Sequence, residues 1–241
     1  MNNNRIEKLP RWKRAFDVVC LVVSAPFWLP LAILLSLWIK AVSRGPVIFR
    51  QERVGHRGRY FFCLKFRSMK VGAETTSHEN YFQRLIATDG PMTKMDEHDP
   101  RLILGGRIIR VLGLDELPQI VNVLRGEMSL VGPRPCTPIE FEHYEPQQRE
   151  RVNMLPGLTG FWQVNGKNKT SFSEMVEMDL FYGRNMCVSL DLAIVMKTVP
   201  ALFGQAVESR AAKAAATRKL AVRVLEQKEP QDVASGLHQV R

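Results

Sequence analysis

The chain has 241 residues, 45% of them hydrophobic, which allows one principal domain with a sizeable core and argues against wholesale disorder. The formal net charge of +10 at pH 7 calls for anionic partners, such as nucleic acid, anionic lipid headgroups or phosphorylated substrates. The four cysteines, at positions 20, 63, 136 and 187, form no Cys-x-x-Cys pair. Neither a metal knuckle nor a disulfide framework is therefore indicated.

Residues 18–39 form a charge-free apolar run that is long enough to cross a bilayer as a helix. Pro26 and Pro30 lie inside it, and each removes a backbone hydrogen bond and favours a kink. Ser24 can help to satisfy the carbonyls that are freed in this way. The sequence therefore predicts a membrane helix that is broken at Ser24 and Pro26.

Basic residues flank the apolar run on both sides, so both of its ends are expected on the cytoplasmic side of the membrane. A helix that dips into one leaflet and returns satisfies this pattern better than a single span does. The span stays open as an alternative. A signal peptide fits less well because the run is too long, and a buried core helix fits less well because of the basic collars and the nearby tryptophans.

Two short strands are expected after this helix, at residues 47–55 and 60–69, with a Gly-His-Arg-Gly turn between them. In the second strand Phe62, Leu64 and Phe66 alternate, which predicts that they share one face and that Lys65 and Arg67 share the other. Those two cations are expected either to grip a phosphate or to line a solvated strand face.

Two adjacent carboxylates, Asp115 and Glu116, open the segment at residues 114–135. Apolar residues at helical spacing follow them, and Gly126 is expected to end the helix. Asp115 then falls at the N-cap, where the helix dipole favours an anion and free N–H groups can hold a phosphate. Simple helix capping by an aspartate is the alternative interpretation.

Further along, residues 156–160 are rich in turn formers and precede a segment, 161–167, that is expected to be a strand and a turn. The amides of Gln163 and Asn165 in that segment are able to recognise a polar ring or a sugar. Residues 174–184 are expected to be helical. Residues 187–203 are expected to form a core helix or one at the membrane interface, and 205–241 a basic helical or disordered tail.

Taken together, these motifs resemble those of the bacterial sugar transferases, the monotopic phosphoglycosyl transferases, in their minimal form. The resemblance covers residues 11–203 and follows the family's order of motifs. Its most specific blocks are Leu-Asp-Glu-Leu-Pro-Gln at 114–119 and Val-Gly-Pro-Arg-Pro at 131–135. Three departures are visible: Ala25-Pro26 stands where many members have Ser-Pro, Gly113 stands where serine is common before Leu-Asp-Glu, and Lys167 stands where arginine is common.

The resemblance implies that sugar 1-phosphate passes from a nucleotide sugar, usually a uridine one, to polyprenyl phosphate, with release of UMP. It implies that Asp115 is a covalent nucleophile and a magnesium ligand, and that Glu116 assists as a general base or by supporting the metal. Basic residues at the family's positions are assigned to phosphate or nucleotide contacts. They are Lys65, Arg67, Arg101, Arg110, Arg134 and Arg151.

The expected fold is therefore α+β: a monotopic membrane protein with a re-entrant helix at 1–44, a mainly helical catalytic domain with a short β-hairpin at 45–204, and a tail at 205–241. The expected location is the cytoplasmic face of the inner membrane. The expected partners are the two substrates and the bilayer, without nucleic acid, and no oligomeric state is predicted. A membrane-anchored basic binding protein without catalytic activity is the alternative.

Overall fold

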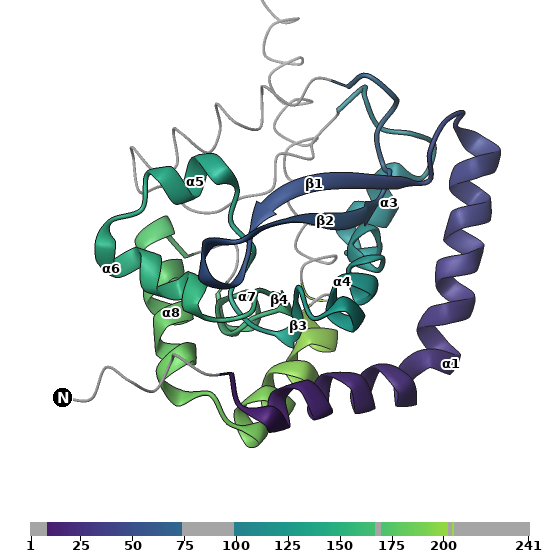
Figure 1. Cartoon of the computed structure of the whole chain (residues 1–241). Coiled ribbons are helices and arrows are strands. Elements are labelled where there is room, and N and C mark those ends of the chain that lie inside the picture. Colours follow the sequence, from purple (N-terminus) through teal and green to yellow (C-terminus); the bar gives the residue numbers. More distant parts are fainter. Residues whose placement is uncertain (1–8, 74–98, 167–169, 202–203, 205–241) are drawn as a thin grey trace, which may run out of the picture. The chain divides into compact units, whose positions relative to one another are not determined.

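The computed structural model describes residues 9–73, 99–166, 170–201 and 204. The chain divides into two compact units, 1–201 and 202–241, and everything below concerns the first. The tail predicted at 205–241 lies outside the described residues. Figure 1 shows a long helix, a hairpin and a series of short helices. Within the described residues the regular elements are α1 (Arg11–Val42), β1 (Ile48–Val54), η2 (His56–Gly58), β2 (Tyr60–Phe66), α3 (Gly106–Val111), η3 (Leu114–Glu116), α4 (Gln119–Arg125), β3 (Ser129–Val131), α5 (Pro138–Glu142), α6 (Pro146–Arg149), η4 (Glu150–Asn153), β4 (Gly157–Thr159), α7 (Phe161–Asn165) and α8 (Phe172–Asn185).

Helix α1 reverses the usual pattern of burial. Its outward face is apolar, with Val23 and Phe27 71% and 80% exposed, whereas Lys13 and Asp17 on its inward face are buried. Among the described residues it is the one helix that is long and apolar enough to cross a membrane. A large exposed apolar surface on a helix with a polar inner face is typical of a segment that contacts lipid. This agrees with the predicted membrane anchor.

Figure 1 shows that α1 changes direction sharply along its course, and Pro26 and Pro30 both lie within it. The Ser24 hydroxyl donates to the Cys20 carbonyl at 2.6 Å. The Trp28 indole N–H donates to the Leu21 carbonyl at 3.0 Å. These side chains supply hydrogen bonds in the turns around the first proline, as a distorted helix requires. The re-entrant path itself stays a prediction.

The predicted hairpin is confirmed: β1 and β2 pair antiparallel, and Gln51 lies opposite Cys63. Alternation does not show how the two faces are buried. Phe61 and Cys63 are buried, whereas Phe62 is 56% exposed. Helix α4 covers the side of β2 that carries Phe61 and Cys63, with Ile120 and Val123 in the same cluster, and Phe66 on the other side is buried in a separate cluster with Ile39. Alternation identified the two faces but not the one that α4 covers.

The segment around the carboxylates begins as a 3₁₀ turn, η3, and continues into α4. Pro118 is the N-cap of α4, so the prediction that Asp115 occupies this position is wrong. The predicted end is confirmed, because Gly126 adopts the left-handed conformation at φ 78° that a C-terminal glycine cap requires. Ile120 and Val123 face the core, and Val121 and Leu124 are partly exposed.

A parallel pair of short strands, β3 and β4, joins two segments far apart in the sequence. The prediction of a turn at 156–160 is wrong for the three middle residues, since Gly157–Thr159 is a strand. Glycine permits the close approach: a Cβ on Gly132 would lie 2.2 Å from the Leu155 carbonyl oxygen, and one on Gly157 would lie 2.1 Å from the Gly132 nitrogen. The backbone leading to Arg134 is therefore packed directly against β4.

The C-terminal part of the unit is helical. Helix α8 confirms the helix predicted at 174–184, and its cap is the reciprocal pair of Ser171 and Glu174. Residues 161–165 form the short helix α7 instead of the predicted strand, because Gln163 and Val164 both bond back to the Gly160 carbonyl. A further helix covers residues 188–201. It buries Asp191 and Ile194 while Leu192 and Met196 are exposed.

Candidate active site

The two carboxylates lie on η3, between two elements that carry cations. Asp115 and Glu116 are both half-buried. Their turn packs against β2 on one side and α3 on the other. It is continuous with α3, because the Gly113 amide donates to the Arg110 carbonyl at 3.1 Å. Gly113 itself has φ 68°, a left-handed conformation that glycine adopts without strain.

Charged side chains converge on the face of β2 that Cys63 occupies. Burial raises the pKa of the Cys63 thiol; the charges of Lys65, Arg53 and Arg134 oppose this rise, and that of Glu116 adds to it. All four charges therefore act at one place. Glu116, Lys65 and Arg134, which the family resemblance assigns to one site, therefore all lie near enough to Cys63 for their charges to act on its thiol.

Arg134 comes from the segment after β3, and its side chain is held by Glu140. The guanidinium donates to a Glu140 carboxylate oxygen at 2.9 Å, and Arg53 lies 3.9 Å from the other oxygen. Burial alone favours the neutral acid, but the charges of Arg134 and Arg53 outweigh it and hold the pKa of Glu140 below its ordinary value. Glu140 therefore fixes Arg134 as an ionised partner at the edge of the site.

Arg151 has a different environment from Arg134. It is 1% exposed, forms a salt bridge with Asp179 and bonds to the Tyr144 hydroxyl. It also donates to the Arg134 carbonyl at 3.1 Å. The Arg151 guanidinium thus already has three protein partners, in the positions where it would otherwise bind a substrate phosphate. The structure places Arg151 beneath the Arg134 segment as a support, and its predicted contact with substrate stays untested.

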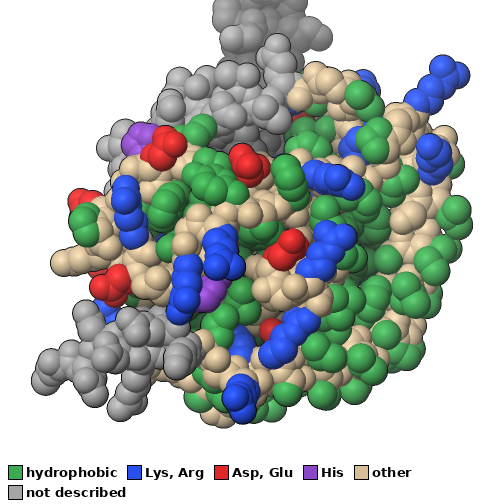
Figure 2. Space-filling model, viewed as in Figure 1, with side chains coloured by type: hydrophobic (Ala, Val, Ile, Leu, Met, Phe, Trp, Pro, Cys, Tyr) green, Lys and Arg blue, Asp and Glu red, His purple; other side chains and the backbone are tan. Residues whose placement is uncertain are grey.

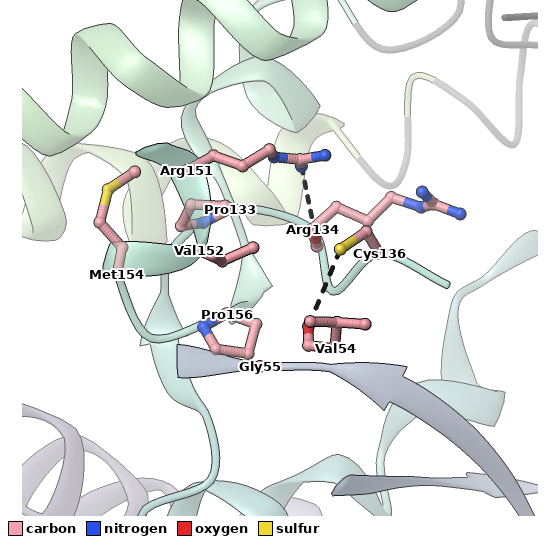
Figure 3. Close-up of a pocket in the computed structure, with 9 residues that line it drawn as sticks. All are labelled: Val54, Gly55, Pro133, Arg134, Cys136, Arg151, Val152, Met154 and Pro156. Atoms are coloured by element: carbon pink, nitrogen blue, oxygen red, sulfur yellow. Dashed lines mark hydrogen bonds between the residues drawn. The ribbon is translucent and has the colours of Figure 1, made fainter. Parts of the chain in front are cut away.

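Figure 3 shows the cavity around these residues. It is lined by Val54, Gly55, Pro133, Arg134, Cys136, Arg151, Val152, Met154 and Pro156. Its volume is about 10 Å³, the scale of one water molecule. The Arg134 side chain points away from the prolines that line it. The cavity is therefore part of the packing that supports Arg134, and it is too small for a nucleotide sugar.

The remaining predicted arginines lie in two places. Arg101 forms a pair with Asp99 at 2.7 Å, and hydrogen bonds from Arg101 lower the pKa of Asp99, with the charge of Arg110 acting in the same direction. Both arginines thus act on Asp99, and Arg110 belongs to α3, which packs against η3. Arg67 lies elsewhere: it is 6% exposed and donates to the Arg44 and Ser43 carbonyls at 2.7 and 3.0 Å. It holds the end of α1, and the prediction that it shares an accessible face with Lys65 is wrong.

The two predicted amides lie on α7. The Asn165 amide donates to the Phe161 carbonyl at 2.8 Å, within its own helix. The Gln163 carbonyl oxygen is buried without a hydrogen-bond partner in the described part of the chain. Sequence reasoning missed Arg53 and Glu140. The Thr-x-x-Glu spacing at 137–140 signals a capping box, but nothing in it indicates that the same glutamate also binds two arginines.

Figure 2 shows one face of the molecule in the view of Figure 1. Lysine and arginine side chains surround a few acidic ones near the centre of this face, and hydrophobic side chains cover the margins where Figure 1 places α1. A site with an excess of cations beside a helix with an exposed apolar face suits a substrate that joins a phosphate to a hydrocarbon chain.

Comparisons with known proteins agree with this arrangement. The family model described as bacterial sugar transferase matches residues 8–205. The exopolysaccharide production protein ExoY of Sinorhizobium fredii is 38% identical over 191 residues, which cover 79% of this chain and 84% of that protein. The undecaprenyl-phosphate galactose phosphotransferase of Salmonella typhimurium is 39% identical, over 82% of this chain and 42% of that protein.

A third relative is the UDP-glucose:undecaprenyl-phosphate glucose-1-phosphate transferase of Caulobacter vibrioides, which is 38% identical over 79% of this chain and 69% of its own length. The family model spans α1, the η3 turn with Asp115 and Glu116, and the Arg134 segment in a single match. A purely non-catalytic binding protein is not supported by these relatives. The chain belongs to the bacterial sugar transferase family and is an enzyme.

Proposed function

We propose that this enzyme transfers a sugar 1-phosphate from a uridine diphosphate sugar to undecaprenyl phosphate, and so begins the synthesis of an exopolysaccharide. The observation that carries the proposal is the position of the Asp115 and Glu116 turn, against the face of β2 where the charges of Lys65 and Arg134 act. The names of the relatives from Sinorhizobium, Salmonella and Caulobacter support the reaction class.

The proposed reaction has two displacements at one phosphorus. In the first, an Asp115 carboxylate oxygen attacks the phosphorus that bears the sugar, and the bond to UMP breaks with its electron pair leaving on UMP. In the second, a phosphate oxygen of undecaprenyl phosphate attacks the same phosphorus and releases the Asp115 carboxylate. Glu116 assists, either by accepting a proton from the acceptor or by supporting the metal. The product is undecaprenyl diphosphate sugar.

Cations of the protein oppose the negative charge of both substrates. Lys65 on β2 and Arg134 beside Glu140 are the proposed ligands of the diphosphate; the support is that the charges of both, like that of Glu116, act on the Cys63 thiol. Arg110 lies next to the start of η3, and its charge and that of Arg101 both act on Asp99, so the two arginines extend the positive region. A phosphoryl transfer depends mainly on positioning and charge stabilisation, which these groups supply.

Magnesium is proposed as the cofactor, with Asp115 as its ligand and Glu116 next to it. Among the described residues there is no group of three or more potential metal ligands. The donor set nevertheless fits, because magnesium is commonly held by one or two carboxylates together with substrate phosphate oxygens. When bound, the ion supplies further positive charge against the diphosphate.

The proposed location is the cytoplasmic face of the inner membrane, with α1 entering one leaflet and returning. The support is the apolar outer face of α1, its sharp bend in Figure 1 and the basic residues at both of its ends. Cysteines introduced at Asn2 and Ser43 should react from the same side of intact cells. Reaction from opposite sides would show a spanning helix instead.

The catalytic proposal is tested by incubating the purified enzyme and magnesium with a panel of nucleotide sugars and undecaprenyl phosphate, and measuring released UMP. Wild-type enzyme given donor alone should gain the mass of one sugar phosphate on Asp115. Asp115→Asn should lower transfer by more than about a thousandfold, as loss of a covalent nucleophile does. It should also abolish the mass gain. Chelation of magnesium should stop UMP release.

Glu52→Gln is the matched control, because Glu52 is an exposed carboxylate on β1, opposite the exposed Phe62. It should react like the wild type. Retained transfer or retained labelling in Asp115→Asn would overturn the covalent mechanism.

A further inference from the structure

The first turns of α1 carry charged side chains on the face toward the catalytic domain. Lys13 is 2% exposed and Asp17 is fully buried. The Lys13 ammonium donates to the Val131 carbonyl at 2.7 Å and to the Tyr182 hydroxyl at 2.8 Å, and it forms a salt bridge with Asp191. Charges are retained in the interior only when such partners compensate for the lost water. A helix that served only as an anchor would not need them.

Lys13 and Asp17 together hold one strand, β3. An Asp17 carboxylate oxygen accepts hydrogen bonds from the Ser129 hydroxyl at 2.9 Å and from the Leu130 amide at 3.0 Å. With the Lys13 bond to Val131, every residue of β3 is bonded to α1. The chain then runs without a break through Gly132 and Pro133 to Arg134.

The neighbouring side chain, Arg14, holds a second element. Its guanidinium donates to the Val123 carbonyl and, at 2.5 Å, to the Leu124 carbonyl. These carbonyls are at the C-terminal end of α4, where a helix has unsatisfied acceptors and favours a cation. Because α4 is a short, continuous extension of η3, fixing its end restrains the turn that carries Asp115 and Glu116.

We propose that Lys13, Arg14 and Asp17 form a clamp, here called the α1 clamp, that sets the position of the Asp115 turn relative to Arg134. The membrane helix is then a positioning element of the active site as well as an anchor. This inference rests on the proposed function, since it assumes that Asp115 and Arg134 act on one substrate. Small displacements between reacting groups lower rates strongly, so loosening the clamp should slow the chemical step.

Arg14→Met is the most direct test, because Arg14 is exposed and its loss leaves no buried charge without a partner. Arg11→Met is the matched control. Arg11 is an exposed arginine at the same end of α1 and makes no hydrogen bond within the described part of the chain, so both variants lose the same charge near the membrane. Sedimentation with membranes should be equal for the two variants.

The readout is a single turnover with donor, in which UMP release gives a rate constant and an amplitude. Arg14→Met should lower the rate constant about tenfold while the amplitude stays at the wild-type value. Loss of folded enzyme would lower the amplitude alone. Arg14→Lys, which keeps a donor for the α4 carbonyls, should recover part of the rate. Hydrogen exchange of amides in residues 114–125 should be faster in Arg14→Met than in Arg11→Met.

Equal rate constants for Arg14→Met and Arg11→Met would overturn the proposal, and so would a change in amplitude only. Faster exchange without a slower rate would show that the clamp does not position the catalytic turn. If wild-type enzyme releases no UMP from any nucleotide sugar, the proposed function fails instead. The exchange comparison then still decides whether Arg14 holds α4.

Discussion

Two groups of charged residues lie side by side and differ in how their charges are compensated. The framework network consists of Arg53, Glu140, Tyr144, Arg151 and Asp179, all of them 3% exposed or less. The second group, here called the dyad region after the carboxylate pair Asp115 and Glu116, consists of this pair with Lys65 and Arg110, all of them half-buried. Arg134 lies between the two: its backbone carbonyl accepts a hydrogen bond from Arg151 and its side chain binds Glu140, while its charge acts on the Cys63 thiol together with those of Lys65 and Glu116.

From this difference we expect the framework network to support the site and the dyad region to contact the substrates. In the framework network each charge is met by a protein group, so the network contributes a fixed position and has little capacity left for a ligand. In the dyad region the charges keep access to solvent and can exchange water for a phosphate. Arginines of the same family motifs are thus expected to have different roles, and burial distinguishes them.

The largest expected effect comes from breaking the framework network. Arg151→Met leaves Asp179 as a buried anion without its salt bridge and removes the bond to the Arg134 carbonyl. Loss of one partner of a buried pair costs about 3–5 kcal/mol of folding free energy. The thermal unfolding midpoint of the detergent-solubilised enzyme should fall accordingly.

The double variant Arg151→Met with Asp179→Leu is the control, because removing both charges leaves neither one buried alone. It should recover most of the lost stability. If the single variant unfolds at the wild-type temperature, Arg151 is not a support. The prediction that it contacts the substrate phosphate would then be the better interpretation.

A smaller effect is expected from the dyad region. Lys65→Met removes a half-buried cation on the Cys63 face of β2 but no buried ion pair within the described residues. Loss of one hydrogen bond to a charged phosphate costs about 1.5–3 kcal/mol, so kcat/KM for the donor should fall by roughly tenfold to a hundredfold. The thermal midpoint should stay near the wild-type value.

Arg50→Met provides the comparison, since Arg50 is an exposed cation on β1 opposite Leu64, on the other face of the hairpin. Its kcat/KM should match that of the wild type. A similar decrease in both variants would mean that general positive charge, and not the position of Lys65, attracts the donor.

The sequence predicted the local elements that depend on neighbouring residues. The hairpin, the end of α4 at Gly126 and the helix α8 follow from turn formers and capping residues, whose effects act over a few positions. The apolar run likewise predicted a helix whose outer face is exposed, because lipid contact is a property of composition.

Features that depend on distant partners were not predictable in the same way. The pairing of β3 with β4 requires two strands of three residues that are more than twenty positions apart, and neither has a periodicity of its own. The burial of Arg67 and Arg151 depends on carbonyls and carboxylates from other elements. A motif assigns an arginine to a family position but does not show whether the charge is already paired.

The smallest expected effect is a pH dependence of the folding stability that Glu140 of the framework network contributes. The charges of Arg134 and Arg53 hold the pKa of Glu140 below its ordinary value of 4.5, despite full burial. The stability that the ionised carboxylate contributes is therefore complete above about pH 4.5 and is lost as the pH falls through the lower folded-state pKa. Each unit by which the two pKa values differ is worth about 1.4 kcal/mol.

Glu140→Gln should consequently be less stable than the wild type at pH 7, and the difference between their thermal midpoints should narrow as the pH falls below 4.5. Glu142→Gln, an exposed change on the same helix α5, should follow the wild type at every pH. A difference that stays constant with pH would mean that Glu140 contributes by packing and not by its charge. Arg134 would then owe its position to the close contact of β3 with β4, and the two charged regions would be joined through the backbone alone.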